Sequence, residues 1–115
     1  MLKIAKEEKQ YRVELFQVNK LNTLFSDLVR QQLIELVEEP GVSVIFNLEG
    51  IRFIDSAGFG VLMEVSVRAR EAASEFLLCN ITDEVRELIN LMELENRFTF
   101  AACEKIREKI LMVLD

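Results

Sequence analysis

The chain has 115 residues, half of them hydrophobic, and a net charge of −6 from 20 acidic and 14 basic residues. This length predicts a single domain over residues 1–115, with a core that needs no cross-links. The basic residues are scattered along the chain, so we expect no nucleic-acid partner, because phosphate neutralisation needs a concentrated positive surface. No apolar run approaches the length of a signal sequence or a membrane span, and we expect a cytoplasmic protein without membrane insertion.

Residues for catalysis and metal binding are scarce. The chain has no histidine, which removes the commonest general base, the serine–histidine pair and most zinc sites. Cys79 and Cys103 are too far apart for a metal knuckle, and we expect both to be buried or partly buried reduced thiols. The expected protein is therefore not an enzyme and holds no metal and no cofactor.

The first half of the chain predicts a hairpin, a helix and an interior strand. Residues 2–7 and 11–17 alternate apolar and polar side chains, with Glu8-Lys9 at the turn. A helix follows, which Pro40-Gly41 ends. Its apolar side chains are expected to face inward: Leu21, Leu24, Phe25, Leu28, Val29, Leu33, Leu36 and Val37. Residues 42–48 then form a short β-branched and aromatic run, which indicates an interior strand.

A polar pair, Asp55-Ser56, precedes an apolar-periodic stretch from Ala57 to about Ala73. Aspartate and serine are preferred helix N-caps, so Ser56 is predicted to lie where a helix begins. One interpretation is that the pair is only a cap. The other is that the free amides and partial positive charge of a helix N-terminus accommodate a phosphate on Ser56.

Two glycines, Gly58 and Gly60, fall within the first turns of this predicted helix. Each costs about 1 kcal/mol relative to alanine in a helix. Their presence indicates close approach, either of another backbone element or of a partner's active site to the serine.

The same helix has two apolar sides, which cannot be equally buried in a small domain. One side, near Ser56, carries Phe59, Met63 and Val67, and the other carries Gly58, Leu62, Val65 and Ala69. Two alternatives stay open. Phe59 and Met63 pack beneath the neighbouring helix, or they form an exposed apolar patch suited to a protein partner.

The second half predicts a strand at residues 75–81, a helix capped by Thr82, a short edge strand at residues 98–100, and a final helix at residues 104–114. The alternation of strands and helices predicts an α/β fold: a mixed sheet of four to five strands covered by about four helices.

Several of these segments resemble the STAS domain, the fold of bacterial anti-sigma-factor antagonists. The resemblance begins with Asn47-Leu48-Glu49 and Phe53-Ile-Asp-Ser-Ala-Gly-Phe-Gly-Val-Leu62. Residues 76–81 resemble the family's next strand, and residues 82–94 resemble its following helix and leucine-rich turn. The match covers about residues 42–100, and the Asp-Ser-Ala-Gly-Phe-Gly segment is its most specific part.

The resemblance implies a partner-switching function. In that family, the serine after the aspartate is phosphorylated by an anti-sigma factor that is itself a serine kinase, and this serine corresponds to Ser56. The unphosphorylated antagonist binds the kinase and frees the sigma factor, and a phosphatase restores this form. The implied docking surface consists of Asp55, Ala57, Gly58, Phe59, Gly60 and Met63, with Asn22 at its edge.

One segment departs from the family pattern. Many members carry Gly-Glu-Leu-Asp at the end of an early strand, where this chain has Asn19-Lys20-Leu21-Asn22. Asn22 can cap the following helix, but it supplies no carboxylate charge. This departure gives weight to an alternative function: a non-enzymatic accessory subunit docked to a transporter or a larger signalling complex, with the serine-helix face as a permanent interface.

Overall fold

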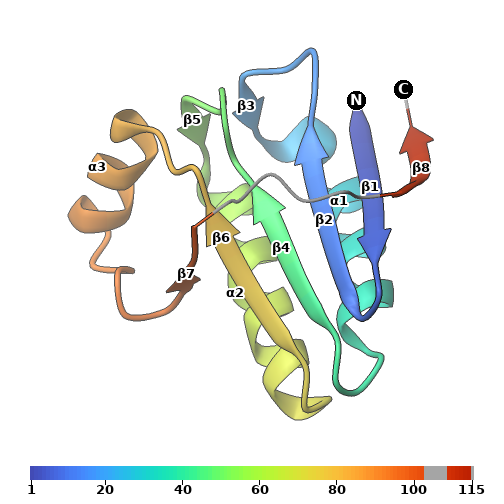
Figure 1. Cartoon of the computed structure of the whole chain (residues 1–115). Helices are drawn as coiled ribbons and strands as arrows, with labels where there is room; N and C mark the ends of the chain where they lie inside the picture. Colours follow the sequence, from blue (N-terminus) through green and yellow to red (C-terminus); the bar gives the residue numbers. More distant parts are fainter. Residues whose placement is uncertain (103–108, 115) are drawn as a thin grey trace.

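The computed structural model describes residues 1–102 and 109–114, in which a six-stranded mixed sheet has the order β7-β6-β4-β2-β1-β8 (Figure 1). Its strands are β1 Leu2–Glu7, β2 Gln10–Leu15, β4 Ser43–Asn47, β6 Glu75–Cys79, β7 Thr99–Phe100 and β8 Lys109–Leu114. Strands β2, β4, β6 and β7 pair in parallel, and β1 is antiparallel to both β2 and β8.

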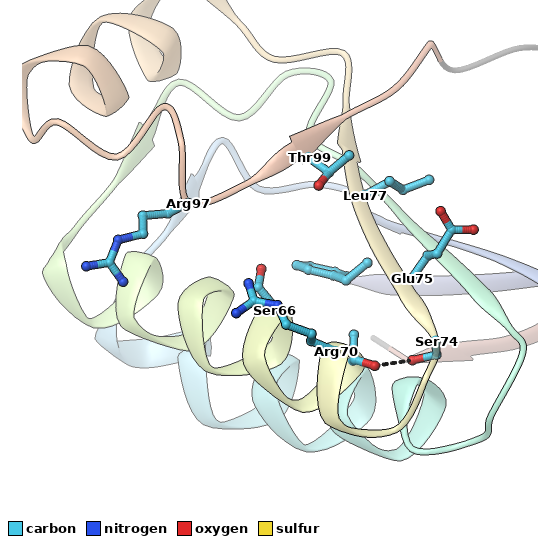
Figure 2. Close-up of a pocket in the computed structure, with 9 residues that line it drawn as sticks. Ser66, Arg70, Ser74, Glu75, Leu77, Arg97 and Thr99 are labelled. Carbon is cyan, nitrogen blue, oxygen red and sulfur yellow. Dashed lines mark hydrogen bonds between the residues drawn. The ribbon is translucent and has the colours of Figure 1, made fainter.

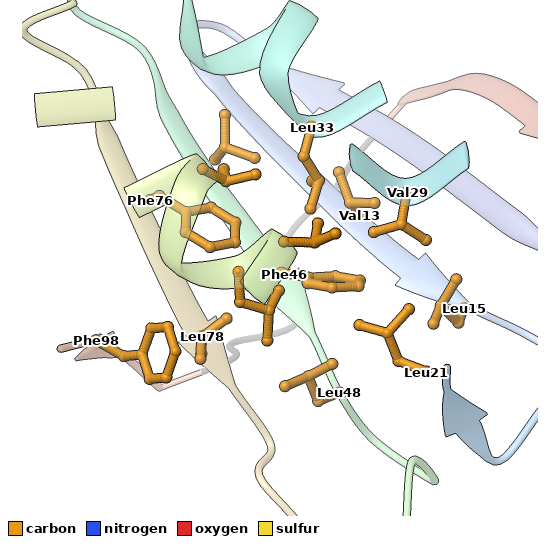
Figure 3. Close-up of a cluster of buried hydrophobic side chains, with 14 of the residues drawn as sticks. Val13, Leu15, Leu21, Val29, Leu33, Phe46, Leu48, Phe76, Leu78 and Phe98 are labelled. Atoms are coloured by element: carbon orange, nitrogen blue, oxygen red, sulfur yellow. The ribbon is translucent and has the colours of Figure 1, made fainter. Parts of the chain in front are cut away.

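Two long helices, α1 (Thr23–Val37) and α2 (Ser56–Glu71), lie side by side behind the sheet in Figure 1, and the shorter α3 (Asp83–Leu91) lies beyond β6. The core fills the space between the sheet and the two long helices (Figure 3). Alternate residues of the central strands, such as Val13, Phe46 and Leu78, are almost fully buried there. Period-two alternation along the strands thus supplies one apolar face for both helices.

The predicted fold class is confirmed, with small differences in the numbers of elements. The hairpin of β1 and β2 turns at Glu8-Lys9 as expected, and β4 is an interior strand between β2 and β6. Thr82 caps α3 by accepting a hydrogen bond from the Val85 amide. The sheet has six strands, and the described residues contain three helices where about four were expected.

The prediction of a final helix over residues 104–114 is wrong for its second half. Residues 109–114 form β8, in which Leu114 pairs with Leu2 and Val113 with Lys3. The apolar spacing fits a helix, but the continuous run from Ile110 to Leu114 fits a strand equally well. The open edge of β1 selects the strand, because pairing there satisfies backbone groups of both strands on either side of a register shift between Ile4 and Ala5. Residues 104–108 lie outside the described residues.

The expectation of reduced thiols is wrong for Cys79, which is buried as predicted but is disulfide-bonded. Cys103 lies outside the described residues. Of the helices in residues 1–102, none is both long and apolar enough to cross a membrane.

Charged side chains join the outer surfaces of α1 and α2. Arg30 donates to both carboxylate oxygens of Glu64, with Nε to Oε1 at 2.8 Å and Nη2 to Oε2 at 2.6 Å. Arg68 bridges Glu64 to Glu38 at the end of α1. The hydrogen bonds from Arg30 lower the pKa of Glu64 below its ordinary value. Ion pairs this exposed contribute about 0.2–1 kcal/mol each, so they align the two helices while the apolar core supplies most of the stability.

A second, two-stranded parallel sheet pairs β3 (Lys20–Leu21) with β5 (Phe53–Ile54). It lies at the end of the molecule where α1 and α2 begin (Figure 1). A Cβ added at Gly58 would lie 2.7 Å from both the Leu21 carbonyl oxygen and the Ile54 Cγ2. The expected close approach of another backbone element is therefore present at Gly58. At Gly60, no heavy atom lies within 4 Å of the corresponding position.

We expect Gly58→Ala to lower the free energy of unfolding, as measured by chemical denaturation. Overpacking costs about 1–3 kcal/mol, because the Leu21 carbonyl cannot rotate away, and this outweighs the gain of about 1 kcal/mol in helix propensity. Gly60→Ala is the matched control, and its open surroundings predict a gain in stability of about 0.5–1 kcal/mol. Equal effects of the two substitutions would contradict the close-contact explanation.

Candidate functional site

One carboxylate joins the N-terminal ends of α1 and α2. Asp55 is the N-cap of α2, and its Oδ1 accepts a hydrogen bond from the Gly58 amide at 2.8 Å. Its Oδ2 accepts from the amide of Thr23 at 3.1 Å and from the Thr23 hydroxyl at 3.2 Å. Thr23 is the first residue of α1. The side chain that caps α2 therefore also holds the first turn of α1 beside it.

The hydrogen bonds to Asp55 favour its ionised form. The bond from the Gly58 amide, followed by those from Thr23, lowers the pKa of the Asp55 carboxyl below its ordinary value of 3.8, against the opposing effect of partial burial. Both helix N-termini add their partial positive charge to this effect. Asp55 is thus a fixed negative charge at neutral pH.

Ser56 is the first residue of α2 and is exposed, at the position predicted from the sequence. Within the described part of the chain, its hydroxyl makes no hydrogen bond. The free amides of this helix N-terminus were expected to accommodate a phosphate on Ser56, and one of them, the Gly58 amide, already donates to Asp55. The site therefore presents a free hydroxyl directly beside a carboxylate that already accepts the Gly58 amide.

The other predicted docking residues divide into accessible and buried sets. Asn22, Asp55, Ala57, Gly60 and Met63 are all partly exposed. Asn22 caps α1, since its Oδ1 accepts a hydrogen bond from the Leu24 amide at 3.0 Å.

Two of the predicted docking residues, Phe59 and Gly58, are buried within the domain. Phe59 is only 1% exposed, because its ring packs into the core beneath α2. Gly58 is buried against Leu21 and Ile54. On the side near Ser56, Met63 is partly buried against the core and Val67 is 47% exposed. The exposed apolar patch therefore lacks its largest predicted member.

The sequence did not predict the exposure of two apolar residues at this end of the molecule. Leu24 is 81% exposed and follows Thr23, although its helical spacing predicted an inward position. Phe53 is 48% exposed and lies in β5, where its neighbour Ile54 is buried. Strict alternation within β5 could have indicated the outward position of Phe53. Nothing in the spacing distinguishes Leu24 from the inward leucines of α1.

These residues define one surface, which we call the helix-start surface. It consists of Asn22, Thr23, Leu24, Phe53, Asp55 and Ser56. The surface combines one free hydroxyl, one carboxylate and two large apolar side chains. No cluster of three metal-ligating side chains lies among the residues that the structure describes, and the expectation that the protein holds no metal or cofactor stays a prediction.

A model of the STAS domain family matches residues 4–113. Among solved structures, the anti-sigma-factor antagonist SpoIIAA in its unphosphorylated form is similar at a TM-score of 0.70, with 19% identity over 88% of each chain. SpoIIAA, a Bacillus cell fate determinant, is also similar in its phosphorylated form, at a TM-score of 0.66 and 18% identity, covering 88% of this chain and 91% of that one.

Two further structures share the fold. An anti-sigma-factor antagonist domain protein from Planctomyces limnophilus has a TM-score of 0.76 and 16% identity, covering 90% of this chain and 91% of that chain. The murine Solute Carrier 26 family member A9, an anion transporter, has a TM-score of 0.67 and 18% identity, covering 85% of this chain but only 20% of the transporter. At these identities, the likeness shows the fold alone.

We expect Asp55→Asn to destabilise the protein at neutral pH, measured as a lower thermal midpoint. Because the folded-state pKa of Asp55 lies below its ordinary value of 3.8, its charge stabilises the fold above that pH. This stabilisation is lost as the pH falls through the lower folded-state pKa. The difference between wild type and variant should therefore shrink in strong acid. Glu95→Gln, in the exposed loop after α3, controls for the loss of one negative charge. A difference in thermal midpoint between wild type and Asp55→Asn that does not change with pH would contradict a stabilising role of the Asp55 charge.

Proposed function

Because the chain belongs to the STAS domain family, we propose that it is an anti-sigma-factor antagonist that binds a serine kinase acting as the anti-sigma factor. Phosphorylation of Ser56 by that kinase ends the complex, and a phosphatase restores the binding form. The observation that carries this proposal is the exposed, unbonded Ser56 hydroxyl at the start of α2, a helix start that Asp55 caps and joins to α1. SpoIIAA, which shares the fold, is known in both unphosphorylated and phosphorylated forms.

The switch follows from the charges at the site. A phosphate adds about −1.5 to −2 charges at neutral pH. Asp55, directly beside it, stays ionised and already accepts the Gly58 and Thr23 amides. Those donors are not available to neutralise the phosphate, so its charge is presented to the partner. Repulsion and added bulk can then disrupt the contact without any change of fold.

Affinity for the partner comes mainly from the apolar part of the helix-start surface. Burying a leucine or phenylalanine side chain fully contributes about 1.5–3 kcal/mol, and Leu24 and Phe53 are exposed beside the phosphorylation site. A complex in which Leu24 and Phe53 are buried would also bring Ser56 close to the kinase active site. Gly60, one turn further along α2, leaves open space there for the approaching partner.

The proposed protein is a cytoplasmic, non-enzymatic regulator. A serine nucleophile needs a base to remove its proton. The chain has no histidine, and the carboxylate beside Ser56 is kept ionised by hydrogen bonds from amides and a hydroxyl that already occupy its oxygens. Ser56 is therefore proposed as a substrate of the kinase. Intact-mass analysis after incubation with ATP and candidate kinases tests this directly, since a single phosphate mapped to Ser56 is expected.

We expect Ser56→Asp to abolish binding to the cognate kinase and Ser56→Ala to bind whether or not ATP is present, as measured by calorimetry. Both variants should keep a thermal midpoint close to wild type, because the exposed hydroxyl makes no hydrogen bond within the described residues. Unchanged binding by Ser56→Asp would reject the phosphorylation switch.

We expect Leu24→Ala to weaken kinase binding by about 10-fold, because truncation removes most of the roughly 1.5–3 kcal/mol that burial of this side chain contributes. Leu91→Ala is the matched control, because Leu91 is 74% exposed at the end of α3, outside the helix-start surface. Surface biosensor measurements compare the two variants with wild type. Equal affinities for all three proteins would remove Leu24 from the interface.

A second candidate function is that of an accessory domain docked to a transporter or a larger signalling complex. Two observations favour the accessory domain. Asn22 is neutral where many STAS proteins place an acidic residue, and the fold is shared with part of the murine anion transporter. Affinity purification from the native organism distinguishes the two functions. An ATP-binding kinase is expected for the antagonist, and a transporter or a large assembly for the accessory domain.

A further inference from the structure

A cavity of about 190 Å³ lies between the C-terminal half of α2, strand β6 and the segment that leads into β7. Ser66 and Arg70 contribute from α2, Phe76 from β6, and Arg97 and Thr99 from the segment around β7. A smaller hollow of about 70 Å³ shares Ser66, Arg70 and Arg97 and adds Met63 and Val67. Figure 2 shows Arg70 extending back along α2 to Ser66, while Arg97 extends away from Thr99.

Two positive charges therefore border one cavity in a chain whose net charge is −6. Neither Arg70 nor Arg97 forms an ion pair with any residue that the structure describes. By contrast, Arg68, only two residues before Arg70, pairs with both Glu38 and Glu64. The dipole of α2 favours a cation in its last turn, which explains a positive charge at Arg70. It does not account for Arg97, which comes from another element.

The cavity has distinct polar and apolar parts. The guanidinium groups of Arg70 and Arg97, which border both hollows, suit the oxygens of a phosphate, which arginine binds through paired hydrogen bonds. The carboxylate of Glu75 borders the opposite end, where it accepts a hydrogen bond from the Ser43 hydroxyl at 2.9 Å. That carboxylate confines an anion to the arginine end, while the side chains of Met63 and Val67 line the adjoining hollow.

We propose that this cavity binds a small phosphate monoester, with the phosphate between Arg70 and Arg97 and a short apolar group in the hollow beside Met63 and Val67. The volume of the cavity suits a ligand of metabolite size. Arg70 lies about 21 Å along the helix axis from Ser56, at 1.5 Å per residue. The phosphate end of the proposed site is therefore remote from Ser56, while Met63, a predicted docking residue, lines the adjoining hollow.

The test is a titration of the isotope-labelled full chain, followed by amide chemical shifts, with phenyl phosphate and with inorganic phosphate at constant ionic strength. We expect phenyl phosphate to shift the amides of Ser66, Arg70, Arg97 and Thr99 and to bind more tightly than inorganic phosphate. Equal affinities would reject the monoester in favour of the free ion. An absence of shifts at these amides would reject the cavity as an anion site.

Substitutions assign the binding to the two arginines. Arg70→Gln and Arg97→Gln should each weaken phenyl phosphate binding by about 10-fold, as the loss of a charge-assisted hydrogen bond predicts. Arg52→Gln is the matched control, since Arg52 is exposed, pairs with Glu84 and lies outside the cavity. All three side chains are exposed, so the variants should fold. Retained affinity in both cavity variants, or an equal loss in the control, would overturn the proposal.

Discussion

The geometry of the candidate site depends on the hydrogen bonds of one carboxylate. Asp55 caps its own helix and binds the first residue of another helix that begins 32 positions earlier in the chain. The small β3–β5 sheet and the contact of Gly58 with Leu21 bring the two helix starts close enough for this bond. Asp55 is ionised, and the amides of Gly58 and Thr23 already donate to it, so these donors are not free to neutralise a charge added at Ser56.

Much of this arrangement could be predicted from local sequence. The strand before Gly50, the cap at Asp55 and the helix after it follow from residue types at fixed spacing, and so does the cap at Asn22. The exposure of Leu24 could not be predicted, because it depends on how far α1 extends beyond the sheet. Phe59 illustrates the same limit, since only the docking of α2 decides which apolar side is covered.

The C-terminal strand and the arginine cavity required three-dimensional structure for a related reason. The run from Ile110 to Leu114 is compatible with helix or strand, and the free edge of β1 decides between them. Arg70 and Arg97 lie far apart in the sequence and come together only because β7 pairs with β6 beside α2. Helix α2 connects this cavity to the helix-start surface, and its ion pairs with α1 keep it aligned between the two.

The link between Asp55 and Thr23 also determines what a partner can recognise. The side chains around Ser56 come from two segments of the sequence that lie together only in the folded protein, where α1 and α2 pack side by side. A short synthetic peptide carrying Asp-Ser-Ala-Gly-Phe-Gly would contain the acceptor serine but neither the second helix nor the bond between Asp55 and Thr23. The epitope is conformational, so a protein that binds it discriminates folded molecules from nascent or denatured ones.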